Sequence, residues 1–202
     1  MTIGLYNAYD PSKFREPHRR VIARAGDLAY GFNMNLALFG FPLPEETRTP
    51  REIADFIAGT TSIGAHGDNF VKLADMGRFS SFPYPSGGFP PQLGKTVLTT
   101  CKPDGKKRIS TKDLAALIDG GQSILLLFGI GPHGVPEKVR PYSQYDFDVT
   151  GSECSLETCT ALGAVCGALD CLLTKIRFSN GRKGHRMVRG RRRPPSPPFR
   201  RS

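Results

Sequence analysis

Short apolar runs alternate with amphipathic stretches along most of the chain, an order typical of strands that are each followed by a helix. Apolar, β-branched or alternating runs predict strands at residues 3–7, 36–39, 96–100, 124–128 and 145–149. Periodicity and capping residues predict helices at residues 17–30, from Thr49-Pro50 to Gly59, from Ser110 or Thr111 to Ile118, and beyond Ser155, which can cap a last helix. The expected fold class is α/β, with a mainly parallel sheet and helices on both faces.

Residues 60–94 interrupt this alternation. They are rich in Gly, Pro and Ser and predict an irregular segment, which at this length is usually functional or mobile. The aromatic residues between 79 and 89 either stack unpaired bases or cover the sheet.

The last predicted helix is apolar around most of its circumference, and Gly163 and Gly167 share one side of it. Such a helix is expected to be buried, in this chain or against a second subunit. The stretch 156–173 carries Glu157 and Asp170 and is short for a membrane span, so no membrane segment is expected.

The positive charge is confined to one end of the chain. Residues 1–176 hold 18 Lys and Arg against all 18 acidic residues, whereas residues 177–202 hold 10 basic residues and no acidic one. This division predicts a folded domain over 1–176 and a disordered or extended basic tail over Arg177–Ser202. Arginine-rich tails favour RNA phosphates, and the alternatives are a solubilising appendage or contact with an anionic membrane surface.

The Cys and His residues do not form a metal-binding pattern. The five cysteines lack a C-x-x-C pair and the four histidines are scattered, so no metal is predicted and the thiols are expected to be reduced. The first ten residues lack the pattern of a signal peptide, so the expected location is cytoplasmic.

Two segments could carry chemistry. Gly129, Gly131 and Gly134 follow a buried strand as G-x-G-x-x-G, but prolines follow and no helix opens there, which excludes a dinucleotide loop. A structural turn and a loop around another adenosine-type ligand remain open. Residues 146–163 pass through a polar turn into a helix N-terminus, whose free N–H groups suit negative charge if the helix is more than simply capped.

These two segments carry a resemblance. LLLFGIGPHGVP followed by SLETCTALGAVCGAL resembles the C-terminal half of the SPOUT class of methyltransferases, which bind S-adenosylmethionine in a trefoil-knotted α/β fold. HRRVIARAGDLAYGF resembles the opening unit of that class. The match covers about residues 2–175 and is closest to an uncharacterised archaeal branch.

The resemblance implies a C-terminal trefoil knot, a homodimer, and three loops that hold the cofactor. On this chain, the residues that would bind S-adenosylmethionine are Thr99, Thr100, Phe128, Gly129, Gly131, Gly134, Val149, Thr150, Gly151, Leu156 and Thr160.

The resemblance also implies catalytic residues. Arg24 matches the arginine that activates the hydroxyl in the ribose-methylating branch, and Ser155 with Leu156 matches two residues of its Ser-Leu-Asn motif. His18 and Glu157 stand where that branch has asparagines, so base methylation stays open. The candidate catalytic residues are Arg24, Ser155 and Glu157. Instead of acting in catalysis, Arg24 could form an ion pair with Asp27 on the surface, and Glu157 could be an ordinary carboxylate in the first turn of the helix.

The expected function is an S-adenosylmethionine-dependent methyltransferase that acts on a structured RNA such as tRNA or rRNA. The alternatives are a non-catalytic RNA-binding protein that keeps the fold, and a methyltransferase with a protein or small-molecule acceptor.

Overall fold

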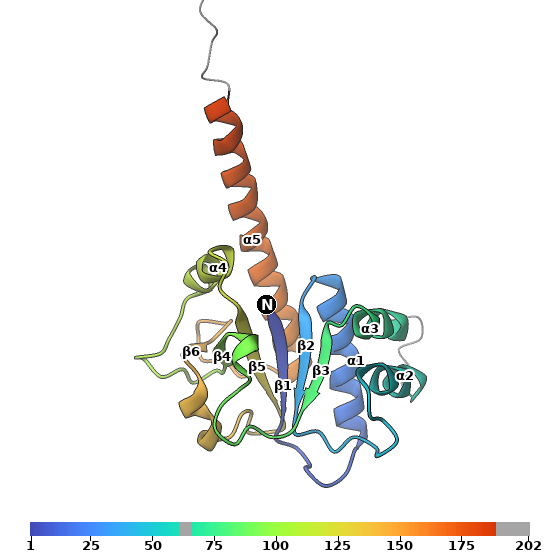
Figure 1. Ribbon diagram of the computed structural model, residues 1–202. Helices are drawn as coiled ribbons and strands as arrows, with labels where there is room; N and C mark the ends of the chain where they lie inside the picture. Colours follow the sequence, from blue (N-terminus) through green and yellow to red (C-terminus); the bar gives the residue numbers. More distant parts are fainter. Residues whose placement is uncertain (61–65, 189–202) are drawn as a thin grey trace, which may run out of the picture.

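A parallel sheet forms the centre of the molecule. The computed structural model describes residues 1–60 and 66–188, and within them six strands pair in the order β3-β2-β1-β5-β4-β6, every pair parallel (Figure 1). The strands are β1 (Thr2–Asn7), β2 (Asn35–Phe39), β3 (Phe79–Phe82), β4 (Lys95–Thr99), β5 (Ile124–Ile130) and β6 (Tyr145–Phe147). The predicted α/β fold with a parallel sheet is confirmed, and β6 lies at an edge, as its alternating sequence indicated. The trefoil knot stays a prediction.

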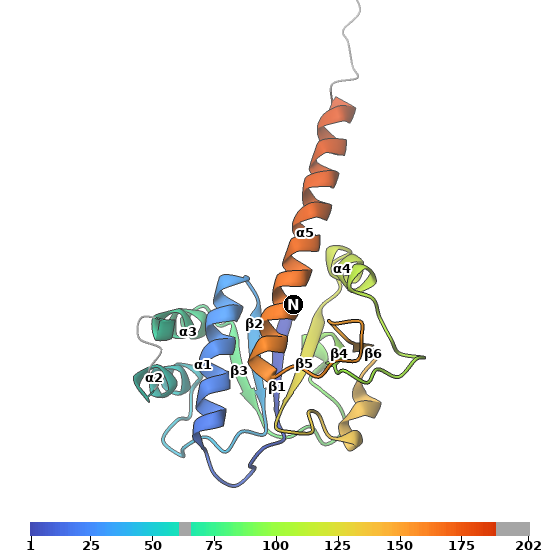
Figure 2. The same cartoon turned by 180° about the vertical axis from the view of Figure 1, so that it is seen from behind.

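Apolar clusters cover the two faces of the sheet differently. In the described residues, five α-helices contribute to one cluster, and α1 and α5 cross that face in Figure 2. The other cluster is covered by loop residues and by two 3₁₀ helices. The sequence predicts helices on both faces, but within the part of the chain that the structure describes the α-helices cover one face and only the short 3₁₀ helices cover the other. The helices are α1 (Glu16–Gly31), α2 (Pro50–Thr60), α3 (His66–Asp75), α4 (Thr111–Asp119), α5 (Thr158–Val188), η1 (Pro91–Leu93) and η2 (Glu137–Tyr142).

Local capping rules set several helix ends. The Ser110 side chain accepts a hydrogen bond from the Asp113 N–H and caps α4. Thr49 and Glu52 form a reciprocal capping box before α2: the Thr49 hydroxyl accepts from the Glu52 N–H, and the Glu52 carboxylate accepts from the Thr49 N–H. The predicted starts of these two helices are confirmed.

The prediction of an irregular segment over 60–94 is wrong for much of its length. Phe70, Leu73 and Ala74 bury one side of α3, and Phe79 begins the short edge strand β3. This strand has only four residues, two of them serines, and it forms by pairing with β2, a partner distant in sequence. The aromatic rings here cover the sheet, since Phe82 and Phe89 both pack on Phe39.

The last helix differs from its prediction at both ends. α5 begins at Thr158, and Glu157 rather than Ser155 caps it, because the Glu157 carboxylate accepts hydrogen bonds from the N–H groups of Cys159 and Thr160. It continues to Val188, past the boundary expected at residue 176, since a helix anchored by a buried first half extends at little cost through basic residues near its C-terminus. The rest of the predicted tail, 189–202, lies outside the described residues.

By length and composition alone, α5 contains a stretch that is able to cross a membrane. The window Thr158–Phe178 is long and apolar enough, so the judgement from sequence that this region is too short is wrong. Core helices pass the same test, and α5 places Leu162, Val165 and Leu169 in the core against the sheet.

Candidate active site

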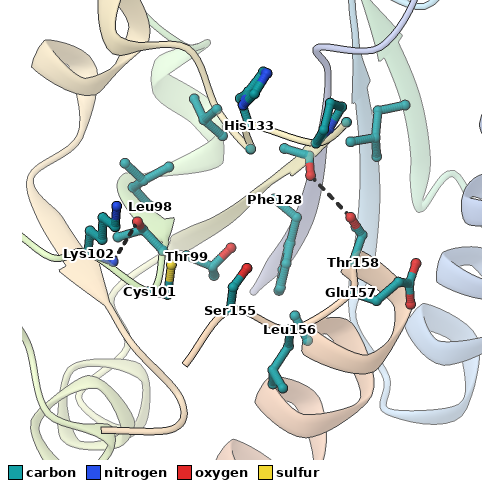
Figure 3. A pocket seen from close by; sticks show the side chains of 18 of the residues that line it. Leu98, Thr99, Cys101, Lys102, Phe128, His133, Ser155, Leu156, Glu157 and Thr158 are labelled. Carbon is teal, nitrogen blue, oxygen red and sulfur yellow. Dashed lines mark hydrogen bonds between the residues drawn. The ribbon is translucent and has the colours of Figure 1, made fainter. Parts of the chain in front are cut away.

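A cavity of about 980 Å³ opens where the strands end, at the carboxyl edge of the sheet. Ligand sites of parallel α/β sheets form at this edge. Three segments provide most of its lining: the end of β4 with the loop after it, the end of β5 with the loop after it, and the loop before α5. The loop between β1 and α1, the start of α1 and the helix η2 add to the lining. In Figure 3, Thr99, Phe128 and Ser155, one from each segment, point toward the same space. The three loops that the resemblance implies are therefore brought together.

The glycine loop, residues 129–134 at the end of β5 and just beyond it, is packed against itself. A Cβ on Gly129 would lie 2.2 Å from the carbonyl carbon of Gly134 and 2.3 Å from the nitrogen of Val135. Gly131 and Gly134 have positive φ angles of 136° and 66°. The close approach expected at Gly129 is thus made by the loop's own backbone, and the glycines give the cavity wall a shape that side chains would block.

An arginine from η2 holds the loop after β4 in place. The Arg140 guanidinium donates to the Thr100 hydroxyl at 3.2 Å and to the Lys102 carbonyl at 2.9 Å. It also pairs at 3.5 Å with Asp146, which is 1% exposed. The Asp146 carboxylate accepts from the Ser143 hydroxyl and the Asp104 N–H as well. This pair therefore supports one cavity wall, and Arg140 itself lines the cavity.

Neither member of this pair was found from the sequence. The only signal was the alternation of the run 145–149, which places a carboxylate inside an edge strand. Nothing in the sequence places Arg140 beside it.

The loop before α5 is organised by Asp148, which lines the cavity and was also missed. Its carboxylate accepts hydrogen bonds from the N–H and hydroxyl of Thr150 and from the Glu153 N–H. Burial opposes ionisation, but these hydrogen bonds outweigh it and lower the pKa of Asp148 below its ordinary value. Thr150 and Gly151 therefore shape the turn and do not line the cavity.

Glu157 and Arg24 meet at the start of α5. Burial acts to raise the pKa of Glu157, but the hydrogen bonds from Cys159 and Thr160, with the nearby Arg24 charge, lower it overall. Arg24 directs its guanidinium to the Cys159 sulfur at 3.7 Å, while Asp27 accepts a hydrogen bond from Asn69. No hydrogen bond or ion pair joins Arg24 to Asp27 in the part of the chain that the structure describes, and the Arg24 side chain is directed toward α5.

The candidate residues from sequence divide into two groups. Those that line the cavity are Thr99, Thr100, Phe128, Gly129, Gly131, Gly134, Val149, Ser155, Leu156 and Glu157. Those that do not line it are Arg24, Thr150, Gly151 and Thr160. Among the described residues, no group of three or more His, Cys, Asp or Glu side chains is placed to hold a metal ion.

Sequence comparison assigns the chain to a family. The family described as "Protein of unknown function (DUF531)" matches residues 1–170. The chain belongs to the DUF531 family. A curated relative, "Uncharacterized protein MJ0224" of Methanocaldococcus jannaschii, is 37% identical over 171 residues, which is 85% of this chain and 94% of the relative.

Solved structures share the fold of this DUF531 protein. A probable methyltransferase from Bordetella pertussis Tohama I is 13% identical with a TM-score of 0.55, over 85% of this chain and 95% of that one. The SpoU methyltransferase AviRb from Streptomyces viridochromogenes is 17% identical with a TM-score of 0.52, over 86% and 60% of the two chains. TrmJ from Z. mobilis ZM4 is 15% identical with a TM-score of 0.53, over 97% and 72%. These likenesses confirm a SPOUT-type fold; at such identities they establish the fold alone.

His18, one of the departures from the ribose-methylating pattern, has a structural place in this DUF531 protein. It is fully buried and does not line the cavity. Its Nδ1 accepts a hydrogen bond from the Arg15 N–H, so its Nε2–H donates to the Asn7 side-chain oxygen at 3.0 Å. Asn7 in turn donates to the Gly40 carbonyl and thereby ties the loop after β1 to the end of β2. The neutral His18 ring therefore holds the loop between β1 and α1 in place through hydrogen bonds.

This network predicts a pH-dependent stability. Burial lowers the pKa of His18 below its ordinary 6.5, with the Asp10 charge opposing and the Arg15 charge adding to the shift. The unfolded chain then binds a proton more readily than the native one, so the free energy of unfolding is unaffected by this group above about pH 6.5 and falls as the pH decreases below it. In urea unfolding, His18→Asn should have a lower free energy of unfolding than wild type at pH 7.5. As the pH decreases from 7 to 5.5, this free energy should fall less in His18→Asn than in wild type.

The matched control is His133→Asn, because His133 is exposed on the loop after β5. It should keep the wild-type decline. An identical decline in wild type and His18→Asn would contradict the assignment.

Proposed function

We propose that this DUF531 protein is an S-adenosylmethionine-dependent methyltransferase that acts on a structured RNA such as tRNA or rRNA. The observation that carries the proposal is the cavity of about 980 Å³ formed by the glycine loop, the loop after β4 and the loop before α5 in a SPOUT-type fold. Methyltransferases are named among the solved structures with that fold.

The chemistry of the cavity fits an amphipathic, positively charged cofactor. Leu98, Phe128 and Phe147 provide apolar surface suited to an adenine ring. Asp148 and Glu157, both with lowered pKa, are ionised at neutral pH and favour a sulfonium. The residues that would hold the cofactor are the ten predicted lining residues together with Asp148.

Methyl transfer is a displacement that needs positioning above all. The cofactor, when bound, would supply a methyl group on a sulfonium. An acceptor lone pair would form the new bond to carbon as the carbon–sulfur bond breaks, the sulfur would leave as a neutral thioether, and the acceptor's proton would pass to water. Ser155 and Glu157 border the space where the acceptor would enter. Arg24, whose guanidinium contacts the Cys159 sulfur at the start of α5 and whose charge acts on Glu157, is assigned the stabilisation of negative charge on the acceptor.

The proposed partners are RNA and a second copy of the chain. The 10 basic residues from Arg177 onward supply phosphate contacts. The dimer is proposed on α5, where a Cβ on Gly163 or Gly167 would meet nothing within 4 Å and one side of the helix is open to a neighbour.

Cofactor binding is expected to protect the exposed thiol of the cavity, Cys154; Cys101 also lines the cavity but is only partly exposed. Cys154 is exposed and lines the cavity, whereas Cys171 is exposed on α5 outside it. With S-adenosylmethionine at ten times its Kd, alkylation of Cys154 by iodoacetamide should slow about tenfold, because only about one site in ten is then empty. Peptide mass spectrometry measures both rates in one sample.

Two other thiols of the same protein, Cys171 and Cys166, serve as controls. Alkylation of Cys171 should not respond to the cofactor, and Cys166, whose pKa burial raises to about 12, should stay unmodified in the native protein. Equal rates at Cys154 with and without saturating cofactor would refute the site.

The reaction itself is tested by nucleoside mass spectrometry. The protein is incubated with total RNA of Methanocaldococcus jannaschii, the source of the relative, and methyl-labelled cofactor. A labelled nucleoside supports the proposal and identifies the target atom. RNA that is bound but never labelled would identify the non-catalytic alternative.

A further inference from the structure

A loop of the folded body carries a local excess of positive charge. The basic loop, residues 102–112, holds five Lys and Arg and a single acidic residue, although residues 1–176 are neutral as a whole. It follows β4 and includes the first two residues of α4, and Figure 2 shows it projecting at the β6 edge of the sheet. This charge is separate from that of the predicted tail.

The backbone of the basic loop is fastened to the sheet edge. The Asp104 N–H donates to the buried Asp146 carboxylate, and the Ile109 N–H donates to the Asp146 carbonyl. The Asp146 N–H donates in turn to the Lys107 carbonyl. The Lys107 ammonium is used inside, where it donates to the carbonyls of Arg140 and Ser143. The loop is therefore a preorganised frame, which lowers the ordering cost of binding.

Three lysines of this frame point their charge outward. Lys102, Lys106 and Lys112 are exposed, and no carboxylate of the described residues forms an ion pair with them. Lys112 lies in the first turn of α4, where the helix dipole disfavours a cation by about 0.3–1 kcal/mol. Stability therefore does not account for a lysine at this position.

The basic loop begins at the cavity itself. Lys102 lines the cavity, and Arg108 donates to the Gly151 carbonyl in the loop before α5. A chain of phosphates following Lys102, Lys106 and Lys112 would thus run from the cavity mouth along the edge of the sheet. Lysines bind phosphate as point charges and read no bases, so such contacts orient a strand.

We propose that the basic loop binds the phosphate backbone of the RNA next to the target nucleotide. The inference rests on the proposed function and moves part of RNA recognition from the basic tail to the folded domain. Its role is to align the strand so that one nucleotide enters the cavity.

The test compares two charge-matched double variants of the full chain. Lys106→Gln with Lys112→Gln removes two cations of the basic loop. Lys72→Gln with Arg48→Gln removes two exposed cations on the α2–α3 side of the molecule. Filter binding of unfractionated tRNA from Methanocaldococcus jannaschii is measured between 0.05 and 0.3 M salt, and circular dichroism melting checks that both variants are folded.

The basic-loop variant should bind at least about tenfold more weakly at 0.1 M salt, with a slope of log affinity against log salt shallower by about 1.4 to 1.8 for two lost phosphate contacts. The control pair should keep the wild-type affinity and slope. A folded basic-loop variant with the wild-type slope would overturn the inference.

Wild-type results separate this inference from the proposed function. If wild type methylates RNA and the basic-loop variant binds it unchanged, the inference fails and the function stands. If wild type binds RNA through the basic loop but transfers no methyl group, the methyltransferase proposal fails and the inference stands. If wild type does not bind RNA, both fail.

Discussion

Gly129→Ala is expected to abolish measurable binding of S-adenosylmethionine. The added Cβ would lie 2.2 Å from the Gly134 carbonyl carbon, so the glycine loop would have to move away from β5 and into the proposed cofactor space. The contact is with backbone, which cannot rotate aside, and the cost to the free energy of unfolding should be about 2 to 3 kcal/mol. Isothermal titration should show at least a hundredfold loss of affinity, and urea unfolding measures the stability.

Gly87→Ala is the matched control. A Cβ on Gly87 would meet nothing within 4 Å and its φ is not positive, so this variant should keep wild-type affinity and stability. If Gly129→Ala bound the cofactor with wild-type affinity, the glycine loop would not be the cofactor wall.

Asp146→Asn should weaken both the fold and the cavity. The carboxylate is 1% exposed and pairs with the Arg140 guanidinium, so its loss leaves this mostly buried charge with only the exposed Glu137 carboxylate, at 3.4 Å, as a counter-charge. The expected loss in the free energy of unfolding is about 3 kcal/mol, at the low end for a buried pair because the Arg140 side chain stays 23% exposed. Arg140 would then hold Thr100 and the Lys102 carbonyl less firmly, and cofactor affinity should fall as well.

Two further variants test whether Asp146→Asn lowers cofactor affinity through Arg140. Asp119→Asn, at an exposed carboxylate at the end of α4, should change neither stability nor affinity. Arg140→Lys keeps the charge but loses the planar contacts to Thr100 and Lys102, so it should lower affinity more than stability. An affinity loss confined to Asp146→Asn, with Arg140→Lys equal to wild type, would argue against support through Arg140.

Most of the fold could be predicted because its signals are local. The continuous apolar run at 124–128 indicated a central strand, and β5 does lie between β1 and β4. Ser110 and Thr49 marked helix starts through hydrogen bonds that span only three residues. The short strand β3 escaped prediction because its four residues are stabilised by pairing with residues of β2 that lie 43 positions earlier, and by packing under α3.

The site could be predicted only in part. Ten of the fourteen candidate residues that the resemblance to the SPOUT class implied line the cavity, since residues at strand ends converge at one edge of a parallel sheet. Thr150, Gly151 and Thr160 serve the turn and the helix start instead, where their hydrogen bonds go to Asp148 or Glu157 or their backbone shapes the turn.

The sequence by itself determined the order of strands and helices apart from α3 and β3, the parallel sheet and the unequal distribution of charge, because periodicity, caps and composition act between near neighbours. The resemblance to the SPOUT class added the loops that meet at one edge. Only the tertiary structure decided that Asp146 pairs with Arg140, that Glu157 rather than Ser155 caps α5, that His18 is locked as a neutral ring, and that the lysines of the basic loop extend from the cavity mouth. Each of these depends on burial and on contacts whose partners are fixed by packing, and no local pattern records them.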